Sequence, residues 1–274
     1  MRFAICNETF VDWPIDRACD FAAECGYTGL EIAPFTLDVD ARQITPAQRR
    51  EVRSAASAAG LQVIGLHWLL AKTTGLHLTS PDAATRRRTQ DYLAELARMC
   101  RELGGSLLVF GSPMQRNLLP GVSSRQGFDH ALEVFGGLVP VLEETEVTLA
   151  IEPLGPSDGN FLTTADEAAE LILALGSTWC RLHLDCKAMS SEALPIPELI
   201  RRHAPLLTHF HANDPNRLGP GMGELPFEPI LAALGEIDYR GWVSVEVFDY
   251  SPGPERLARE SIDYLLACLE RLAD

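Results

Sequence analysis

Eight short apolar segments recur along the 274-residue chain, and each leads into a loop and then into a segment with helical periodicity. The apolar segments are Phe3–Cys6, Gly29–Ile32, Gln62–Leu66, Ser106–Phe110, Thr148–Ile151, Arg181–Leu184, Leu207–Phe210 and Val243–Val247. Because they are short and lack long polar alternation, they are typical of strands that are buried on both faces of a parallel sheet.

The segments between these strands are predicted to be helices, over residues 15–25, 48–59, 82–103, 128–144, 164–175, 197–203, 229–235 and 254–272. Pro140 predicts a kink or a break in the fourth helix. Eight strands alternating with eight helices predict an α/β fold with one domain, a single (β/α)8 TIM barrel over residues 1–274. The alternative, an open doubly wound sheet, requires a glycine-rich phosphate loop after the first strand, and residues 7–10 contain no glycine.

Charge and cysteine usage restrict the partners of the chain. The formal net charge is −15, which disfavours binding to nucleic acid. The sequence contains no apolar run long enough for a membrane helix, and its first residues do not resemble a signal peptide. The seven cysteines form no CxxC pair and favour small core residues in a reducing compartment. We therefore expect a cytoplasmic protein that binds neither nucleic acid nor a membrane.

Polar residues stand at the ends of four consecutive strands, where the active site of a barrel lies. They are Glu152, Asp185, His211 and Glu246, separated by 33, 26 and 35 residues, each about one strand–helix unit. Three carboxylates that converge on one point repel each other unless a cation binds between them. The sequence therefore predicts a divalent metal site, and this ligand set suits Mn²⁺, Mg²⁺ or Co²⁺ better than a structural zinc.

Further candidates for substrate binding follow other strands. His67 and Trp68 follow the third strand, Glu31 ends the second, and Asn7 and Glu8 follow the first. Lys187 follows the sixth strand, and Arg217 lies in a loop rich in glycine and proline after the seventh. A tryptophan at the rim can pack on the apolar face of a sugar, whereas His183 and His209 are interpreted as hydrogen-bonded core residues.

Four segments resemble the xylose isomerase-like TIM-barrel superfamily: IEPL (151–154), LHLDCKAM (182–189), HFHANDPNRLGPGMGELPF (209–227) and YRGWVSVEVF (239–248). They are most similar to its sugar isomerase/epimerase branch, which includes D-tagatose 3-epimerase-type ketose 3-epimerases. The resemblance extends over nearly the whole chain and is most specific from residue 148 to residue 250.

The resemblance implies that Glu152, Asp185, His211 and Glu246 bind one divalent metal, commonly Mn²⁺, and that the two glutamates form the acid/base pair. It also implies substrate contacts for Arg217 and for Asp158, where ketose epimerases typically carry glutamate. Family members are often dimers or tetramers, so a homo-oligomer is expected. These epimerases usually have histidine three residues after the aspartate ligand. This chain has Ala188 there, and the neighbouring Lys187 could supply the lost polar contact.

These residues predict a metal-dependent sugar epimerase or isomerase. A carboxylate removes the proton next to a carbonyl, the metal stabilises a cis-enediolate, and a second carboxylate returns the proton. A lyase, hydratase or deglycosidase acting on a 3-keto sugar would use the same residues and remains an alternative. Two others are a non-catalytic sugar-binding subunit, which needs no second glutamate, and an endonuclease IV-like nuclease, which the charge and the missing histidine at 188 oppose.

Overall fold

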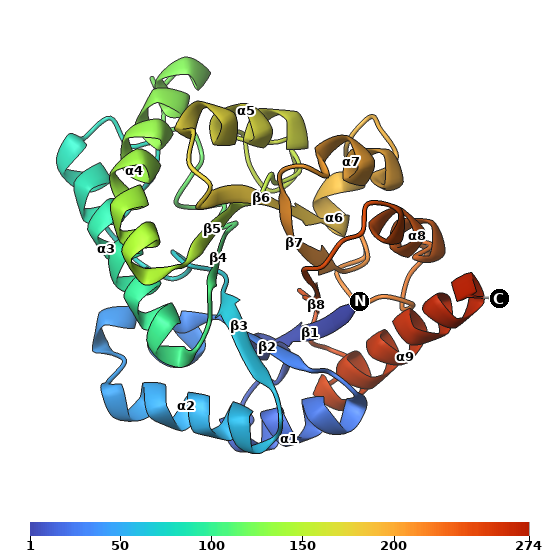
Figure 1. The fold of residues 1–274 in the computed structure, drawn as a ribbon. Coiled ribbons are helices and arrows are strands. Elements are labelled where there is room, and N and C mark those ends of the chain that lie inside the picture. The colour runs from blue at the N-terminus through green and yellow to red at the C-terminus, as the bar shows by residue number, and fades with distance from the viewer. Residues whose placement is uncertain (274) are drawn as a thin grey trace.

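The computed structural model describes residues 1–273, and within them eight parallel strands form a closed barrel surrounded by helices (Figure 1). The strands are β1 (Arg2–Cys6), β2 (Gly29–Ile32), β3 (Gln62–Leu66), β4 (Leu107–Phe110), β5 (Thr148–Ile151), β6 (Cys180–Asp185), β7 (Leu207–Ala212) and β8 (Trp242–Val245). Each strand pairs with the next along the chain, and β8 closes the barrel against β1. The predicted TIM barrel is confirmed.

The helices form the outer ring. The α-helices are α1 (Ile15–Cys25), α2 (Pro46–Ala58), α3 (Ala83–Leu103), α4 (Ser124–Thr145), α5 (Ala165–Leu175), α6 (Cys186–Met189), α7 (Ile196–His203), α8 (Glu228–Glu236) and α9 (Pro254–Ala273), and three 3-10 turns are η1 (Asn7–Thr9), η2 (Pro34–Thr36) and η3 (Ala41–Gln43). Within residues 1–273, no helix has the length and apolarity needed to cross a membrane.

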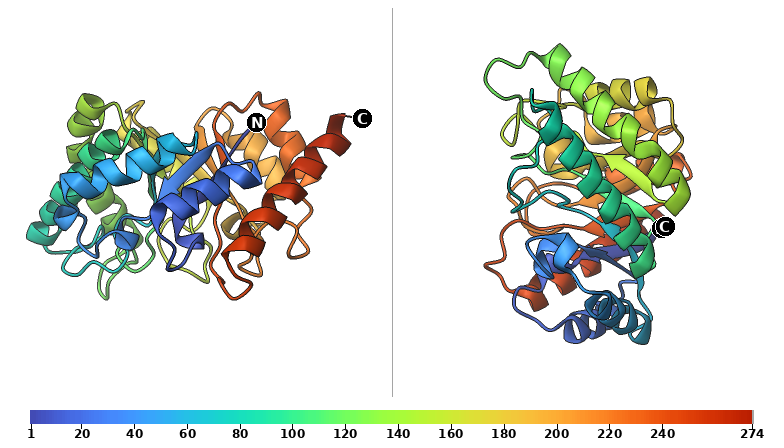
Figure 2. Two further views of the ribbon diagram at one scale, coloured as in Figure 1. Left: turned by 90° about the horizontal axis from the view of Figure 1, so that it is seen from below. Right: turned by 90° about the vertical axis from the view of Figure 1, so that its left-hand side faces the viewer.

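The C-terminal ends of all strands open on one face, because every neighbouring pair is parallel. In the left view of Figure 2 the chain begins near the upper face, and long loops extend from the lower one. Those loops include η1 after β1, η2 and η3 after β2, and the segments between β3 and α3 and between β4 and α4. Loops of this kind, on this face, form the functional site of a TIM barrel.

The break predicted at Pro140 is wrong, because α4 continues through this residue from Ser124 to Thr145. Pro140 lies on the exposed side of the helix. The carbonyl at its i−4 position belongs to Gly136, which is also exposed, so water can satisfy the carbonyl that loses its N–H partner. The helix begins earlier than predicted because Ser123 and Gln126 form a capping box.

The core agrees with the cysteine interpretation. All seven cysteines are free thiols and are buried. All but Cys6 belong to the main hydrophobic core cluster. Cys6 differs from the other six because it faces the inside of the barrel, where its Sγ lies 3.6 Å from Oγ of Ser244 and close to ligand atoms of Glu8, His67 and Glu246. Burial raises the pKa of Cys6 to about 11. The other six thiols serve as small apolar residues.

Candidate active site

The C-terminal ends of four consecutive strands bring Glu152, Asp185, His211 and Glu246 to one cavity of about 390 Å³. Asp185 and His211 are paired in register across β6 and β7, so they lie at the same level of the barrel. Glu152 directly follows β5, and Glu246 directly follows β8. All four side chains are buried.

The same cavity brings together most of the predicted substrate contacts. His67, Trp68, Asp158, Lys187 and Arg217 line it together with the four strand-end residues. Trp68 and Arg217 have positive φ angles of 51° and 77°, a backbone conformation that side-chain-bearing residues adopt rarely and mainly at functional sites.

His211 is held between two carboxylates. Its Nδ1 lies 2.9 Å from Oε2 of Glu246, and its Nε2 lies 3.2 Å from Oε2 of Glu31. Burial disfavours the imidazolium form, but the charges of Glu246 and Glu31 outweigh burial and raise the pKa of His211 well above its usual range. A metal that binds this imidazole therefore displaces a proton.

The carboxylates of the cavity repel one another, and nearby positive groups do not fully offset their negative charge. Burial, followed by the charge of Glu246, raises the pKa of Asp185 to about 6. Burial, followed by the charges of Asp185 and Glu246, raises the pKa of Glu152 well above its usual range. A divalent cation among these oxygens would reverse both shifts, so the electrostatics of the cavity fit a metal.

Ligand-atom geometry also fits a metal. Ligand atoms of Glu152, His183, Asp185 and His211 all lie within 4.8 Å of one another. Glu246 belongs to an adjoining group with Cys6, Glu8 and His67, and its hydrogen bond to His211 connects the two groups. This mixture of carboxylate oxygens and imidazole nitrogens can hold a divalent metal ion.

The space beside β4 accommodates one of these ligands. A β-carbon at Gly111 would lie 1.6 Å from Oε2 of Glu152, so any larger residue at this position would displace the carboxylate. The carboxylate of Glu152 thus occupies the space that a side chain at position 111 would fill.

Two predicted contacts lie outside this cavity. Glu31 lies within β2 and is fully buried, and its Oε2 lies 3.2 Å from Nε2 of His211. Its Oε2 also lies 2.8 Å from Nε2 of His209, so its carboxylate is engaged by two imidazoles. Asn7 accepts a hydrogen bond from the backbone N–H of Ala33 at 2.7 Å and donates one to Thr36 at 2.8 Å.

The two deep histidines differ from each other. His209 hydrogen-bonds Glu31, which agrees with its interpretation as a hydrogen-bonded core residue. For His183 that interpretation is wrong, because neither ring nitrogen has a hydrogen-bond partner within residues 1–273. Its Nε2 lies 3.9 Å from Oε1 of Glu152, and burial lowers its pKa well below its usual range. His183 is therefore a neutral imidazole beside the carboxylate cluster.

Lys187 forms an ion pair with Asp158. Its Nζ lies 2.6 Å from Oδ2 of Asp158 and 5.3 Å from the ring centre of Phe248. Both charged side chains are partly exposed, and Ala188 lines the same wall of the cavity. A cation and an anion thus stand together beside the alanine that replaces the usual histidine.

Sequence reasoning missed two residues that fix the ligands. Asn213 donates a hydrogen bond to Oδ2 of Asp185 at 2.5 Å, and its Oδ1 accepts one from the backbone N–H of Lys187 at 2.8 Å. Asn213 lies two residues after His211, and residues two apart along a strand point to the same side of the sheet. This spacing could have indicated that Asn213 faces the site.

Arg116 is the second missed residue, and its side chain is fully buried. Its guanidinium donates to the carbonyl of Glu152 at 2.5 Å and to those of Phe161 and Leu162 at 3.0 and 3.1 Å. Burial lowers its pKa to about 10. Arg116 therefore holds the loop after β5 against the end of that strand. No motif in the sequence indicates this role.

The fold and the site together define a class: a (β/α)8 barrel with a buried carboxylate–histidine cluster that could hold a metal at the C-terminal ends of its strands. Residues 19–268 match the family of xylose isomerase-like TIM barrels. The chain belongs to this family.

Known relatives agree with this assignment. The chain is 32% identical over 248 residues to a D-psicose 3-epimerase of Enterocloster bolteae, covering 88% of this chain and 79% of that protein. Its fold is similar to a crystal structure of D-psicose 3-epimerase in the presence of D-fructose, with a TM-score of 0.85, 21% identity and coverage of 98% and 99% of the two chains. It is also similar to 3-keto-D-glucoside 4-epimerase from Escherichia coli, with a TM-score of 0.84, 21% identity and coverage of 98% and 100%.

Proposed function

We propose that this protein is a divalent-metal-dependent sugar epimerase or isomerase in which Glu152 and Glu246 form the acid/base pair. The observation that carries the proposal is that both glutamates line one cavity together with Asp185 and His211. Binding a sugar needs no second buried carboxylate, whereas removing a proton from one face of a carbon and returning one to the opposite face uses two.

Glu152, Asp185, His211 and Glu246 are the residues that would hold the metal, and Mn²⁺ is the ion we propose, with Mg²⁺ or Co²⁺ as alternatives. When bound, a divalent ion polarises a carbonyl group and stabilises negative charge that develops on its oxygen. Asn213 fixes the orientation of Asp185 by its hydrogen bond, and Glu31 fixes that of His211.

The protein residues then perform the proton transfer. One of the two glutamates takes the proton from the carbon next to the carbonyl, and the other delivers a proton to the same carbon or to its neighbour. Delivery to the same carbon from the other face inverts it, and delivery to the neighbour exchanges aldose and ketose. Arg217, His67 and the Asp158–Lys187 pair line the cavity where sugar hydroxyls would bind, and Trp68 offers an apolar face.

Solvent deuterium exchange tests this proposal. In Mn²⁺-loaded protein, Glu152→Gln and Glu246→Gln should each reduce exchange into a reactive sugar by about 10²–10⁴-fold, because glutamine cannot transfer the proton. The exposed Glu170 provides the matched control, and Glu170→Gln should keep the wild-type rate. Full exchange in both active-site variants would refute the acid/base roles. An eliminated product in place of exchange would identify the lyase alternative.

Two further predictions concern the state of the protein in the cell. We propose a homo-oligomer, either a dimer or a tetramer, which mass photometry of the purified chain can test. We also propose a cytoplasmic location, supported by seven free thiols that a reducing compartment preserves.

A further inference from the structure

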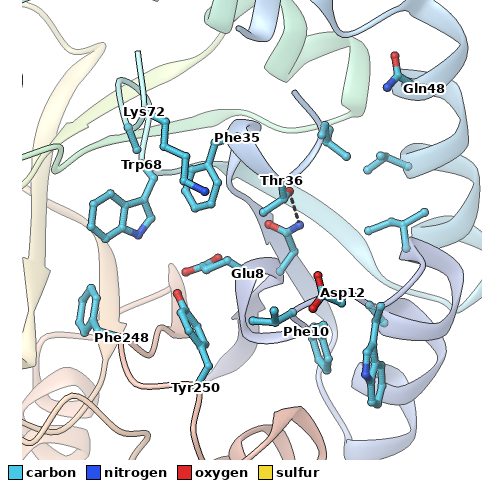
Figure 3. A pocket seen from close by; sticks show the side chains of 18 of the residues that line it. Glu8, Phe10, Asp12, Phe35, Thr36, Gln48, Trp68, Lys72, Phe248 and Tyr250 are labelled. Carbon is cyan, nitrogen blue, oxygen red and sulfur yellow. Dashed lines mark hydrogen bonds between the residues drawn. The ribbon is translucent and has the colours of Figure 1, made fainter. Parts of the chain in front are cut away.

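A second and larger cavity of about 960 Å³ adjoins the candidate active site (Figure 3). It lies among the loops after β1, β2, β3, β4, β7 and β8, and we call it the vestibule. Trp68, Pro113, Arg217 and Phe248 line both cavities, so the two are continuous. The cavity of about 390 Å³ already contains the proposed reacting groups, so the vestibule is additional space.

Aromatic and aliphatic side chains form most of the vestibule wall. Phe10, Trp13, Phe35, Trp68 and Tyr250 contribute aromatic rings, and Figure 3 shows Phe35, Trp68, Phe248 and Tyr250 around one open space. Rings arranged in this way bind flat apolar groups by stacking and edge contacts.

Apolar residues at the vestibule also remain exposed. Val11 is 45% exposed and Met114 is 75% exposed, although both are large hydrophobic side chains. Both side chains line the same cavity and are accessible to a ligand that enters it.

The charges of the vestibule disfavour an anion. Asp12, Glu51 and Glu8 line it, against Lys72 and Arg217 as cations. The ammonium of Lys72 lies 4.2 Å from the ring centre of Phe35, where the aromatic face already engages it. A phosphate group would therefore meet carboxylates without a cluster of basic groups, whereas an uncharged ring avoids this repulsion and can contact the aromatic side chains of the wall.

Glu8 supplies a polar group at the junction of the two cavities. Its side chain is 4% exposed, and its Oε2 lies 2.8 Å from Nε2 of His67. Its Oε1 has no hydrogen-bond partner among the residues described. Figure 3 shows this carboxylate between Trp68, Phe248 and Tyr250. A buried carboxylate oxygen without a partner needs a donor, and a sugar hydroxyl provides one.

We propose that the substrate is a keto sugar bearing an aryl group, such as an aryl 3-keto glycoside, rather than a free monosaccharide. The aryl group occupies the vestibule, and Oε1 of Glu8 accepts a hydrogen bond from a hydroxyl of the sugar. This inference rests on the proposed function, because the sugar must reach Glu152 and Glu246 in the smaller cavity while its aryl group stays in the vestibule.

The experiment compares two probes on the full-length Mn²⁺-loaded protein, methyl and 4-nitrophenyl 3-keto-β-D-glucopyranoside. Calorimetry measures binding, and NMR in D₂O measures exchange. The aryl glycoside should bind at least about tenfold more tightly, which corresponds to about 1.4 kcal/mol. Equal affinity for the two probes would overturn the inference.

Variants locate the effect. Val11→Glu combined with Met114→Glu places charge at the vestibule and should reduce the aryl-to-methyl affinity ratio at least about threefold. Leu173 is 68% exposed and does not line the vestibule, so Leu173→Glu should leave the ratio unchanged. An unchanged ratio in the double variant, or a change in its oligomeric mass in place of a change in ratio, would overturn the inference.

The two proposals fail in distinguishable ways. If the vestibule inference alone is wrong, both glycosides exchange deuterium, and the two bind with equal affinity. If the proposed function alone is wrong, neither glycoside exchanges, but the aryl glycoside still binds more tightly, and the double variant still removes that preference.

Discussion

Replacing Glu31 by glutamine is the perturbation that most directly tests how the barrel interior supports the proposed metal site. Glu31 is fully buried and contacts Nε2 of both His209 and His211, at 2.8 and 3.2 Å. When a metal takes the place of the proton on the other nitrogen of His211, the remaining N–H still donates to Glu31. A carboxylate in this position orients the imidazole and makes it a better ligand.

Loss of such a partner weakens metal binding by about 10–100-fold, or about 1.4–2.8 kcal/mol. A second effect opposes it. Glu31 also raises the pKa of His211, so Glu31→Gln lowers that pKa and reduces competition by protons. The opposing effect fades once the pH exceeds the pKa of His211. The loss of affinity should therefore be larger at about pH 8.5 than at about pH 6.5.

Isothermal titration of metal-free protein with Mn²⁺ measures this effect. Circular dichroism first establishes that the variant is folded. The control is Glu24→Gln, because the side chain of Glu24 is 68% exposed and pairs with Arg259 at the surface. A folded Glu31→Gln variant whose Mn²⁺ affinity matches that of wild type at the higher pH would refute the reasoning.

Three further predictions concern pH, specificity and stability. An unfolded aspartate has a pKa of about 3.9, whereas Asp185 has one of about 6 in the fold, so metal-free protein should lose thermal stability as the pH rises from about 4 to about 6. Over the same range Mn²⁺ should bind more tightly, and melting curves with and without the ion measure both effects. Lys187→Met leaves Asp158 unpaired and should raise KM about tenfold while kcat changes less than about threefold, which steady-state kinetics can measure. Arg116→Met leaves three carbonyls without a hydrogen-bond donor and should lower the free energy of unfolding, measured in urea, by about 3 kcal/mol. Arg87 is exposed, and Arg87→Met should lower this free energy by less than about 0.5 kcal/mol.

The barrel was predictable because buried parallel strands leave short apolar segments, and the strand ends were predictable because they follow those segments directly. Asp185 and His211 are paired in register, as converging strand ends require. Depth was harder to predict. Glu31 and His211 are each one residue before the end of their strands, yet His211 lines the cavity whereas the carboxylate of Glu31 is buried against His209 and His211.

Features that depend on the paths of loops could not be read from periodicity. Arg116 bonds carbonyls of a loop more than 35 residues away, and its sequence surroundings give no sign of them. The vestibule likewise forms from loops that follow six different strands. The continuity of α4 through Pro140 depends on which side of the helix faces water, and the helical pattern over residues 128–144 did not indicate it. The start of α4 at Ser124 depends on the capping box of Ser123 and Gln126, which sequence reasoning also missed.

We propose that this cavity transfers a proton on a sugar with the help of a divalent ion. NMR in D₂O of free and 3-keto sugars, incubated with the protein and with or without Mn²⁺, measures this transfer. Deuterium is expected at the carbon next to the carbonyl, dependent on the added ion and lost in Glu152→Gln and Glu246→Gln. Tight binding of Mn²⁺ and of sugars without any exchange or elimination would contradict it and would favour a sugar-binding subunit.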